Sequence, residues 1–434
     1  MAIESPLRRA VTNFSVLMSG RAVAGILSIV TVTLVARILG PVEFGVLVLV
    51  HTTAMVTRGL LNFKPSDTVV RFGVAAFDAR DHGTFARLLR FTLALDAITA
   101  VTSALAMLLL VTFAAPLLGL PEALSGPAAL YALVLLLSGT GTAKGVLRVA
   151  GRFDAISVQQ TVGPLLRLLG IGLAYLSDVG LVAYVFVWVM ASAGEYAFLN
   201  VRGWRELRAQ GYAMQMPSWR RAAGEFAGIW VFVRTLYWQS NLELLQRNGL
   251  ILLAGAMLGP AGAGMFRIAR EFADVLAKPV VVVRQAVFPD LERLWREGDR
   301  NFRGLYLRLG ALSAVIAAVV VGAVAIFGER LLGALVGVAY IDGAALLTWL
   351  MLAAAIDLAA AALRPAAYAI GAATGSLRAQ ALGAGVNVGL FLLLVPTVGL
   401  TGAGAAAAGA ALTVALLMAW LLATGTPAAG SRTR

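Results

Sequence analysis

Charged side chains recur at helical spacing inside long apolar segments of this sequence, where they are the groups best placed to bind a ligand. One segment carries five of them: Arg267, Arg270, Glu271, Asp274 and Lys278. Residues three or four apart in a helix lie on the same face. A charge at the centre of a lipid bilayer costs about 2.5–3.5 kcal/mol. A charged face inside an apolar helix must therefore contact water, a partner or a substrate.

Several arginines in other apolar segments have no acidic residue one helical turn away. These are Arg21, Arg58 and Arg234. A guanidinium group binds phosphate oxygens through two parallel hydrogen bonds and stays ionised at any working pH. We therefore predict that a cationic, water-filled cavity binds an anionic group through Arg21, Arg58, Arg234, Arg267 and Arg270.

The alternative is that the charges within the membrane pair with one another. Glu271 and Asp274 would neutralise the basic residues of their own segment, and Glu243 would neutralise Arg247 four residues later. Asp96, Glu195 and Asp357 would pair between helices, or else carry a proton or coordinate sodium. The candidate cavity or ion-coupling charges are thus Asp96, Arg167, Glu195, Glu243, Arg247, Glu271, Asp274, Lys278 and Asp357.

The residue inventory excludes most metal and thiol chemistry. The chain has no cysteine and only two histidines, His51 and His82. Disulfides and thiol catalysis are therefore excluded, and a histidine-based metal site is not expected. We predict no metal and no cofactor.

The elements that must position these charges are membrane helices. Of the 434 residues, 60% are hydrophobic and only 13% are charged, against about 25% charged in soluble domains. The apolar runs are long and show no ten-residue alternation, which favours a helix bundle over a barrel. About 20 apolar residues cross a bilayer, and twelve candidate spans lie near residues 11–37, 43–63, 88–114, 126–147, 155–177, 180–201, 224–257, 262–289, 304–328, 342–363, 377–395 and 401–424.

The basic residues predict the orientation of these spans. With twelve spans, the basic residues outside them fall on one side together with both termini, except Arg37 and Arg330. Loops rich in Lys and Arg stay in the cytoplasm, so both termini are predicted to be cytoplasmic. The net charge of +13 then reflects orientation, and no nucleic-acid partner is expected. Val11–Leu39 is too long for a signal peptide and is interpreted as the first span.

Short motifs recur at nearly one offset along the chain. Leu39-Gly40-Pro41 with Gly45 returns as Leu258-Gly259-Pro260 with Gly264, and Leu147-Arg148 returns as Leu363-Arg364. Such a repeat predicts two six-helix halves in the same orientation, with the substrate site between them. The predicted division is 1–202, a basic cytoplasmic linker 203–221, and 222–434. Gly385 and Gly389 are expected to let helices pack closely.

The segment Ala36-Arg37-Ile38-Leu39-Gly40-Pro41-Val42-Glu43-Phe44-Gly45 resembles the first hairpin of Wzx-like polysaccharide flippases. These belong to the multidrug/oligosaccharidyl-lipid/polysaccharide flippase superfamily. Gly151-Arg152-Phe153 and Phe288-Pro289 to Trp295 also fit this family. The resemblance implies an all-α bundle of about twelve helices, in two parallel six-helix pseudo-repeats around a central cavity.

The same resemblance implies a function in bacterial surface-polysaccharide synthesis. A flippase of this family moves undecaprenyl-pyrophosphate-linked oligosaccharide across the inner membrane, for lipopolysaccharide O-antigen, capsule or exopolysaccharide. Its partners would be that lipid, membrane lipids, a coupling proton or sodium ion, and the polysaccharide polymerase machinery. Alternatives are a multidrug/cation antiporter, disfavoured by the basic excess within the spans, and a lipid II flippase, which usually has fourteen spans. A membrane-bound glycan-processing enzyme is a remote alternative, because no catalytic motif or large outer loop is present.

Overall fold

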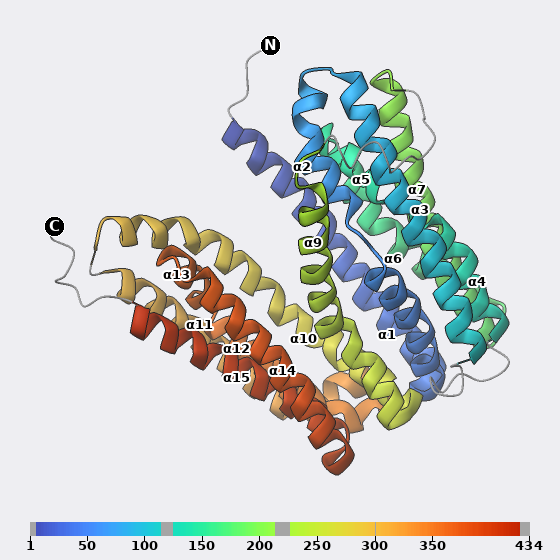
Figure 1. Cartoon of the computed structure of the whole chain (residues 1–434). Helices are drawn as coiled ribbons and strands as arrows, with labels where there is room; N and C mark the ends of the chain where they lie inside the picture. Colours follow the sequence, from blue (N-terminus) through green and yellow to red (C-terminus); the bar gives the residue numbers. More distant parts are fainter. Residues whose placement is uncertain (1–5, 114–124, 213–225, 300, 426–434) are drawn as a thin grey trace. The chain divides into compact units, whose positions relative to one another are not determined.

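The computed structural model describes residues 6–113, 125–212, 226–299 and 301–425. Within these ranges the chain is helical and forms no strand. The predicted all-α membrane bundle is therefore confirmed (Figure 1).

The helices before residue 213 are α1 (Pro6–Leu60), α2 (Pro65–Asp78), α3 (His82–Phe113), α4 (Ser125–Leu135), α5 (Gly141–Val149), α6 (Phe153–Leu176) and α7 (Leu181–Ala209). Those after residue 225 are α9 (Ile229–Leu244), α10 (Leu250–Arg296), α11 (Asn301–Leu335), α12 (Ala344–Ala359), α13 (Leu363–Ala369), α14 (Ala373–Val398) and α15 (Leu400–Gly425). Short 3-10 turns precede α5 and α12, and a π-helical turn, Leu245–Gly249, joins α9 to α10.

Glycine–proline breaks divide the two longest helical segments. Gly40 in α1 has φ 72° and Gly259 in α10 has φ 73°. Positive φ is strained for residues with a Cβ, and the following Pro41 and Pro260 cannot donate to the helix ladder. The recurring Leu-Gly-Pro motif therefore marks the predicted turn between consecutive spans.

Nine helical segments in the described ranges are long and apolar enough to cross a membrane. Two of them, Ser15–Asp78 and Ile229–Leu276, contain the breaks at Gly40 and Gly259 and so cover two predicted spans each. The fifth predicted span, 155–177, corresponds to α6, which lies outside those nine segments. The helices thus follow the order of the twelve predicted spans.

The chain forms two compact units. The first contains residues 1–35 and 46–252, and the second contains residues 36–45 and 253–434. The predicted halves differ from these units in two places, because residues 36–45 belong with the C-terminal unit and residues 226–252 belong with the N-terminal one. Part of the predicted linker, 203–209, continues α7, and residues 213–221 lie outside the described ones.

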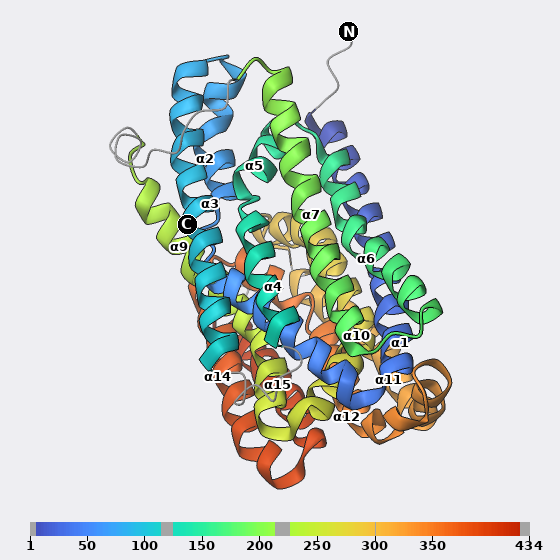
Figure 2. The same cartoon turned by 90° about the vertical axis from the view of Figure 1, so that its right-hand side faces the viewer.

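In the first unit, α3, α4, α6 and α7 run side by side (Figure 2). Short α2 and α5 pack together at one end of these long helices. Their contact is apolar and includes Val69, Phe85, Val146 and Leu207 from four different helices. This packing fixes the positions of α2 and α5, which carry much of the site described below.

In the second unit, the two glycine–proline hairpins contact each other directly. A Cβ placed on Gly45 would overlap the carbonyl oxygen of Pro260, and one on Gly264 would lie 2.7 Å from the carbonyl oxygen of Pro41. The expectation of close packing at Gly385 and Gly389 is wrong, because a Cβ at either position would meet nothing within 4 Å. Tight helix contact therefore occurs at the repeated motif.

Candidate functional site

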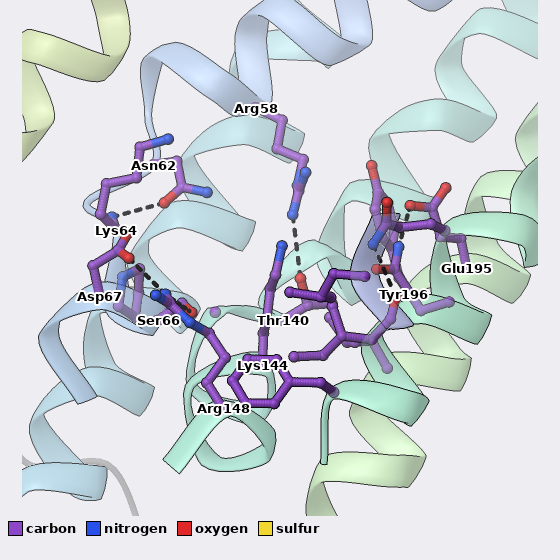
Figure 3. Close-up of a pocket in the computed structure, with 18 of the residues that line it drawn as sticks. Arg58, Asn62, Lys64, Ser66, Asp67, Thr140, Lys144, Arg148, Glu195 and Tyr196 are labelled. Atoms are coloured by element: carbon purple, nitrogen blue, oxygen red, sulfur yellow. Dashed lines mark hydrogen bonds and ion pairs between the residues drawn. The ribbon is translucent and has the colours of Figure 1, made fainter. Parts of the chain in front are cut away.

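A polar pocket of about 700 Å³ opens in the first unit. It is lined by α1, the turn 62–64 and the start of α2, together with α5, α6 and α7 (Figure 3). Five basic side chains face it: Arg21, Arg58, Lys64, Lys144 and Arg148. Only two acidic side chains, Asp67 and Glu195, are among the described residues that line it. The pocket therefore carries an excess of positive charge.

Arg58 is held in a fixed orientation near the end of α1. Its Nη2 donates hydrogen bonds to the Ser138 carbonyl oxygen and to Thr140 Oγ1, each at 3.2 Å. Its guanidinium carbon lies 4.8 Å from the centre of the Tyr196 ring, a distance typical of cation–π contact. Its Nε is buried and finds no acceptor among the described residues. Arg58 is thus preorganised on the wall of the pocket.

Lys144 extends from α5 toward Arg58, so that the two cationic groups face each other across the pocket (Figure 3). Its electrostatic neighbours include Arg58, Arg148 and Arg21 as well as Asp67. No hydrogen bond from its amino group to another described residue is found. Like charges repel most strongly where water is scarce, so this arrangement favours an anion between Lys144 and Arg58.

Asp96 holds the start of α5 without lining the pocket. Its carboxylate is buried, and its two oxygens accept hydrogen bonds from the backbone N–H of Gly141 at 3.0 Å and of Thr142 at 2.6 Å. This is a helix N-cap supplied from another helix. A Cβ on Gly141 would lie 2.9 Å from the carboxylate, so the approach requires glycine. Asp96 therefore positions Thr140, which in turn orients Arg58.

The remaining charges of the pocket are partly neutralised. Arg148 Nη1 donates to Asp67 Oδ1 at 2.6 Å and to Ser66 Oγ at 3.3 Å. On the other side of the pocket, Gln159 Nε2 donates to Glu195 Oε1. Arg148 is therefore held in an ion pair, whereas Arg21, Arg58 and Lys144 form no ion pair with another described residue.

The predicted residues of the first unit divide into two groups. Arg21, Arg58 and Glu195 line the pocket together. Arg167 lies instead over the ring of Trp188, with its guanidinium carbon 5.7 Å from the ring centre, and Arg234 is exposed on α9 away from the pocket lining. The side chain of Glu243 lies outside the described ones, and Arg247 interacts within the chain.

In the second unit, the charged face of α10 is at least partly self-paired. Arg267 Nη2 lies 2.7 Å from Glu271 Oε2, one turn away. Arg270 and Asp274 also take part in interactions within the chain. The side chain of Lys278 lies outside the described ones, and Asp357 is exposed on α12. Of the two alternatives for Arg267, the geometry matches the ion pair.

Three basic residues of the pocket were not among those predicted from the sequence. Lys64, Lys144 and Arg148 were counted with the basic residues at the cytoplasmic ends of spans two and four, whereas the structure places them on the pocket wall. One signal was present: Lys144 and Arg148 are four residues apart, and Leu147-Arg148 is part of the internal repeat. That spacing would have placed both cations on one face of a helix.

Comparison with known proteins gives one family and a common fold. Residues 34–344 match the model of a family described as "Polysaccharide biosynthesis protein". Inner membrane protein YghQ of Escherichia coli (strain K12) is 27% identical over 353 residues, which cover 78% of this chain and 96% of that protein.

Two solved structures are similar over nearly the whole chain. A multidrug resistance MATE family transporter of the MOP superfamily, in an inward-facing conformation, has a TM-score of 0.71 and 16% identity, covering 93% of this chain and 94% of that one. The lipid II flippase MurJ, in an inward closed conformation, has a TM-score of 0.70 and 10% identity, covering 93% and 86%. The chain therefore shares the fold of this transporter and this flippase.

Proposed function

Because the chain belongs to the polysaccharide biosynthesis protein family and has a transporter fold, we propose that it is a flippase for a polyprenyl-pyrophosphate-linked oligosaccharide. The observation that carries the proposal is the pair of facing cations, Arg58 and Lys144, in the pocket of the first unit. A pyrophosphate diester carries two negative charges and cannot cross hydrocarbon unaided. The pocket supplies the positive charge that would compensate them.

The basic residues of the pocket would each contribute differently to binding the pyrophosphate. Arg58 would bind phosphate oxygens through the guanidinium donors that face the pocket. Lys144 would act as a mobile point charge on the opposite side of the same phosphate group. Arg21 would add charge from α1. No bond would be made or broken, so the pocket needs neither a nucleophile nor a general base.

Transport would proceed by alternating access. The pyrophosphate would enter from the cytoplasmic side of the inner membrane, with both termini of the chain on that side. The polyprenyl tail would stay in the bilayer, while the headgroup bound in the pocket passes from one side of the membrane to the other. A proton or sodium ion would couple the cycle to an energy source. The product would then be available to the polymerase that assembles lipopolysaccharide, capsule or exopolysaccharide chains.

A multidrug/cation antiporter is the competing function, because a MATE transporter shares the fold. A site for organic cations needs net negative charge or an aromatic cage. The pocket here has five basic and two acidic lining residues, which would repel a cation. The charge of the pocket therefore favours an anionic substrate.

The proposal is tested by binding of undecaprenyl pyrophosphate to the purified protein in nanodiscs. A hydrogen bond to a charged group contributes about 1.5–3 kcal/mol. Arg58→Ala and Lys144→Ala should therefore each weaken binding by about 10- to 100-fold. Arg208→Ala, which removes an exposed charge at the end of α7, is the matched control and should bind as the wild type does. Wild-type affinity in both pocket variants would reject the proposed site.

A further inference from the structure

We propose that Glu195, with Gln159 and Gln160 beside it, forms a subsite for the sugar attached to the pyrophosphate. The inference rests on the proposed function and adds to it the residues that recognise the saccharide. It is based on hydrogen-bond acceptors of the pocket for which a pyrophosphate group offers no donor.

The carboxylate of Glu195 is held in place by α6. Gln159 Nε2 donates to its Oε1, and Gly163, one turn further along α6, leaves space for Oε2. A Cβ on Gly163 would lie 2.7 Å from that oxygen. No hydrogen-bond partner of Oε2 is found among the described residues. Glu195, which lines the pocket, therefore keeps one carboxylate oxygen without a hydrogen-bond partner among the described residues.

The two glutamines add further acceptors. The amide nitrogen of Gln159 is used by Glu195, and that of Gln160 donates to the Ile156 carbonyl oxygen at 3.4 Å. Each glutamine therefore keeps its side-chain carbonyl oxygen for another donor. Together with Glu195 Oε2, these groups form an acceptor-rich wall of the pocket.

An acceptor-rich wall requires a ligand with hydrogen-bond donors. Phosphate oxygens of an ionised diester only accept, and they are repelled by a carboxylate. Sugar hydroxyl groups donate, and a carboxylate accepts two neighbouring hydroxyls well. A metal cation would be repelled by the five basic residues of the same pocket. A saccharide is therefore the chemical class that matches this wall.

The position of the wall agrees with a sugar next to the phosphate. Glu195 is the chain neighbour of Tyr196, whose ring centre lies 4.8 Å from the Arg58 guanidinium carbon. In Figure 3, Glu195 and Tyr196 lie on one side of the Arg58–Lys144 pair, and Asp67 and Lys64 lie on the other. A volume of about 700 Å³ is within the range of small-ligand sites. The pocket would hold the pyrophosphate and the sugar next to it, and the rest of the oligosaccharide would extend beyond it.

The test compares two pyrophosphate diesters of equal charge: undecaprenyl pyrophosphate capped with a methyl group in place of sugar, and undecaprenyl pyrophosphate carrying a single N-acetylhexosamine. Affinities are measured in nanodiscs in sodium-free buffer, so that a bound sodium ion cannot produce the effect. We expect the wild type to bind the sugar-bearing lipid at least about tenfold more tightly, as one charge-assisted hydrogen bond would give. Glu195→Gln should abolish that ratio while it leaves unchanged, or strengthens, the affinity for the lipid without sugar.

Two further variants test whether the affinity ratio depends specifically on the Glu195 carboxylate. Asp67→Asn removes the other carboxylate of the pocket and should change both affinities in parallel, leaving their ratio as in the wild type. Gly163→Ala should reduce the ratio as Glu195→Gln does, because its methyl group would displace Glu195 Oε2. An unchanged ratio in Glu195→Gln would overturn the sugar subsite. If Arg58→Ala and Lys144→Ala both bind the two lipids with wild-type affinity, the proposed function is overturned instead.

Discussion

The carboxylate of Asp96 joins two parts of the first unit by accepting the backbone N–H groups of Gly141 and Thr142. A buried donor that loses its acceptor costs about 1–3 kcal/mol. We therefore expect Asp96→Ala to lower the thermal stability of the protein, and Asp96→Asn to lower it less, since an asparagine keeps one acceptor oxygen. Affinity for undecaprenyl pyrophosphate should fall in the same order, because Thr140 would no longer orient Arg58.

The same variants separate this role from ion coupling, which the sequence also suggested for Asp96. A coupling carboxylate would show its effect on the dependence of transport on pH or sodium, with the unfolding temperature of Asp96→Asn unchanged. That outcome would contradict the helix-capping role. Thermal unfolding in detergent, followed alongside transport at several pH values, distinguishes the two.

Arg267 and Glu271 provide a second test at the level of single residues. Their contact at 2.7 Å predicts that each single alanine variant removes the same ion pair from within the membrane. Removing both should then be less harmful than the single losses combined. Coupling free energies between contacting residues reach about 0.5–3 kcal/mol. A double-mutant cycle on stability measures this term, and a coupling of zero, with transport lost only in Arg267→Ala, would favour substrate contact instead.

Single residues show how far the sequence could predict the site. Arg21 and Arg58 were identified because an unpaired arginine deep in an apolar segment is costly. Lys144 was not, because it lies at the cytoplasmic end of the fourth predicted span and was counted with the basic stretch that follows it. Its place on the pocket wall depends on the cap from Asp96, 45 residues earlier in the chain. Such a long-range contact cannot be read from local spacing.

At the level of elements, the two glycine–proline hairpins support each other by close backbone contact. Gly45 approaches the backbone of Pro260, and Gly264 approaches that of Pro41. Backbone atoms cannot move aside as a flexible side chain can. Gly45→Ala and Gly264→Ala should each destabilise the protein by about 1–3 kcal/mol, as overpacking typically does.

Span eleven contains a matched control for this prediction. A Cβ at Gly385 would meet nothing within 4 Å, and Gly385→Ala should be neutral or slightly stabilising, because alanine favours the helix. Unfolding temperatures of the three variants in one detergent give the comparison. Equal behaviour of Gly45→Ala and Gly385→Ala would show that the hairpin contact is not tight in solution.

The long membrane-spanning helices were largely predictable from the sequence, and the short helices α2 and α5 were not. Runs of about 20 apolar residues identified the spans, and the Leu-Gly-Pro repeat located the breaks at Gly40 and Gly259. Helix α2 fell in a segment interpreted as a basic loop, and α5 was not separated from the fourth predicted span, 126–147. Their stability comes from packing against α3 and α7 through Val69 and Val146, a tertiary effect that outweighs local composition.

For the whole molecule, the division into units depends on contacts between distant parts of the chain. Residues 36–45 belong with the second unit through contacts such as the hydrogen bond from Tyr340 Oη to the Ala36 carbonyl oxygen at 3.2 Å. Helix α9 belongs with the first unit, where Asn241 Nδ2 donates to the Leu60 carbonyl oxygen at 3.2 Å. The internal repeat predicted two halves, but no local pattern indicates that each unit includes a segment from the other half.

These exchanged segments yield a prediction about transport. If alternating access moves each unit as one body, a link within a unit should not impede it. The chain has no cysteine, so pairs introduced at Leu60 and Asn241, or at Ala36 and Tyr340, would be the only thiols present. Joining either pair with a short reducible crosslinker should leave translocation of the lipid-linked oligosaccharide unchanged relative to the single-cysteine variants. Transport that stops on linking and returns on reduction would show that the unit deforms internally, and that the cycle involves bending of α1 or α9 rather than motion of rigid units.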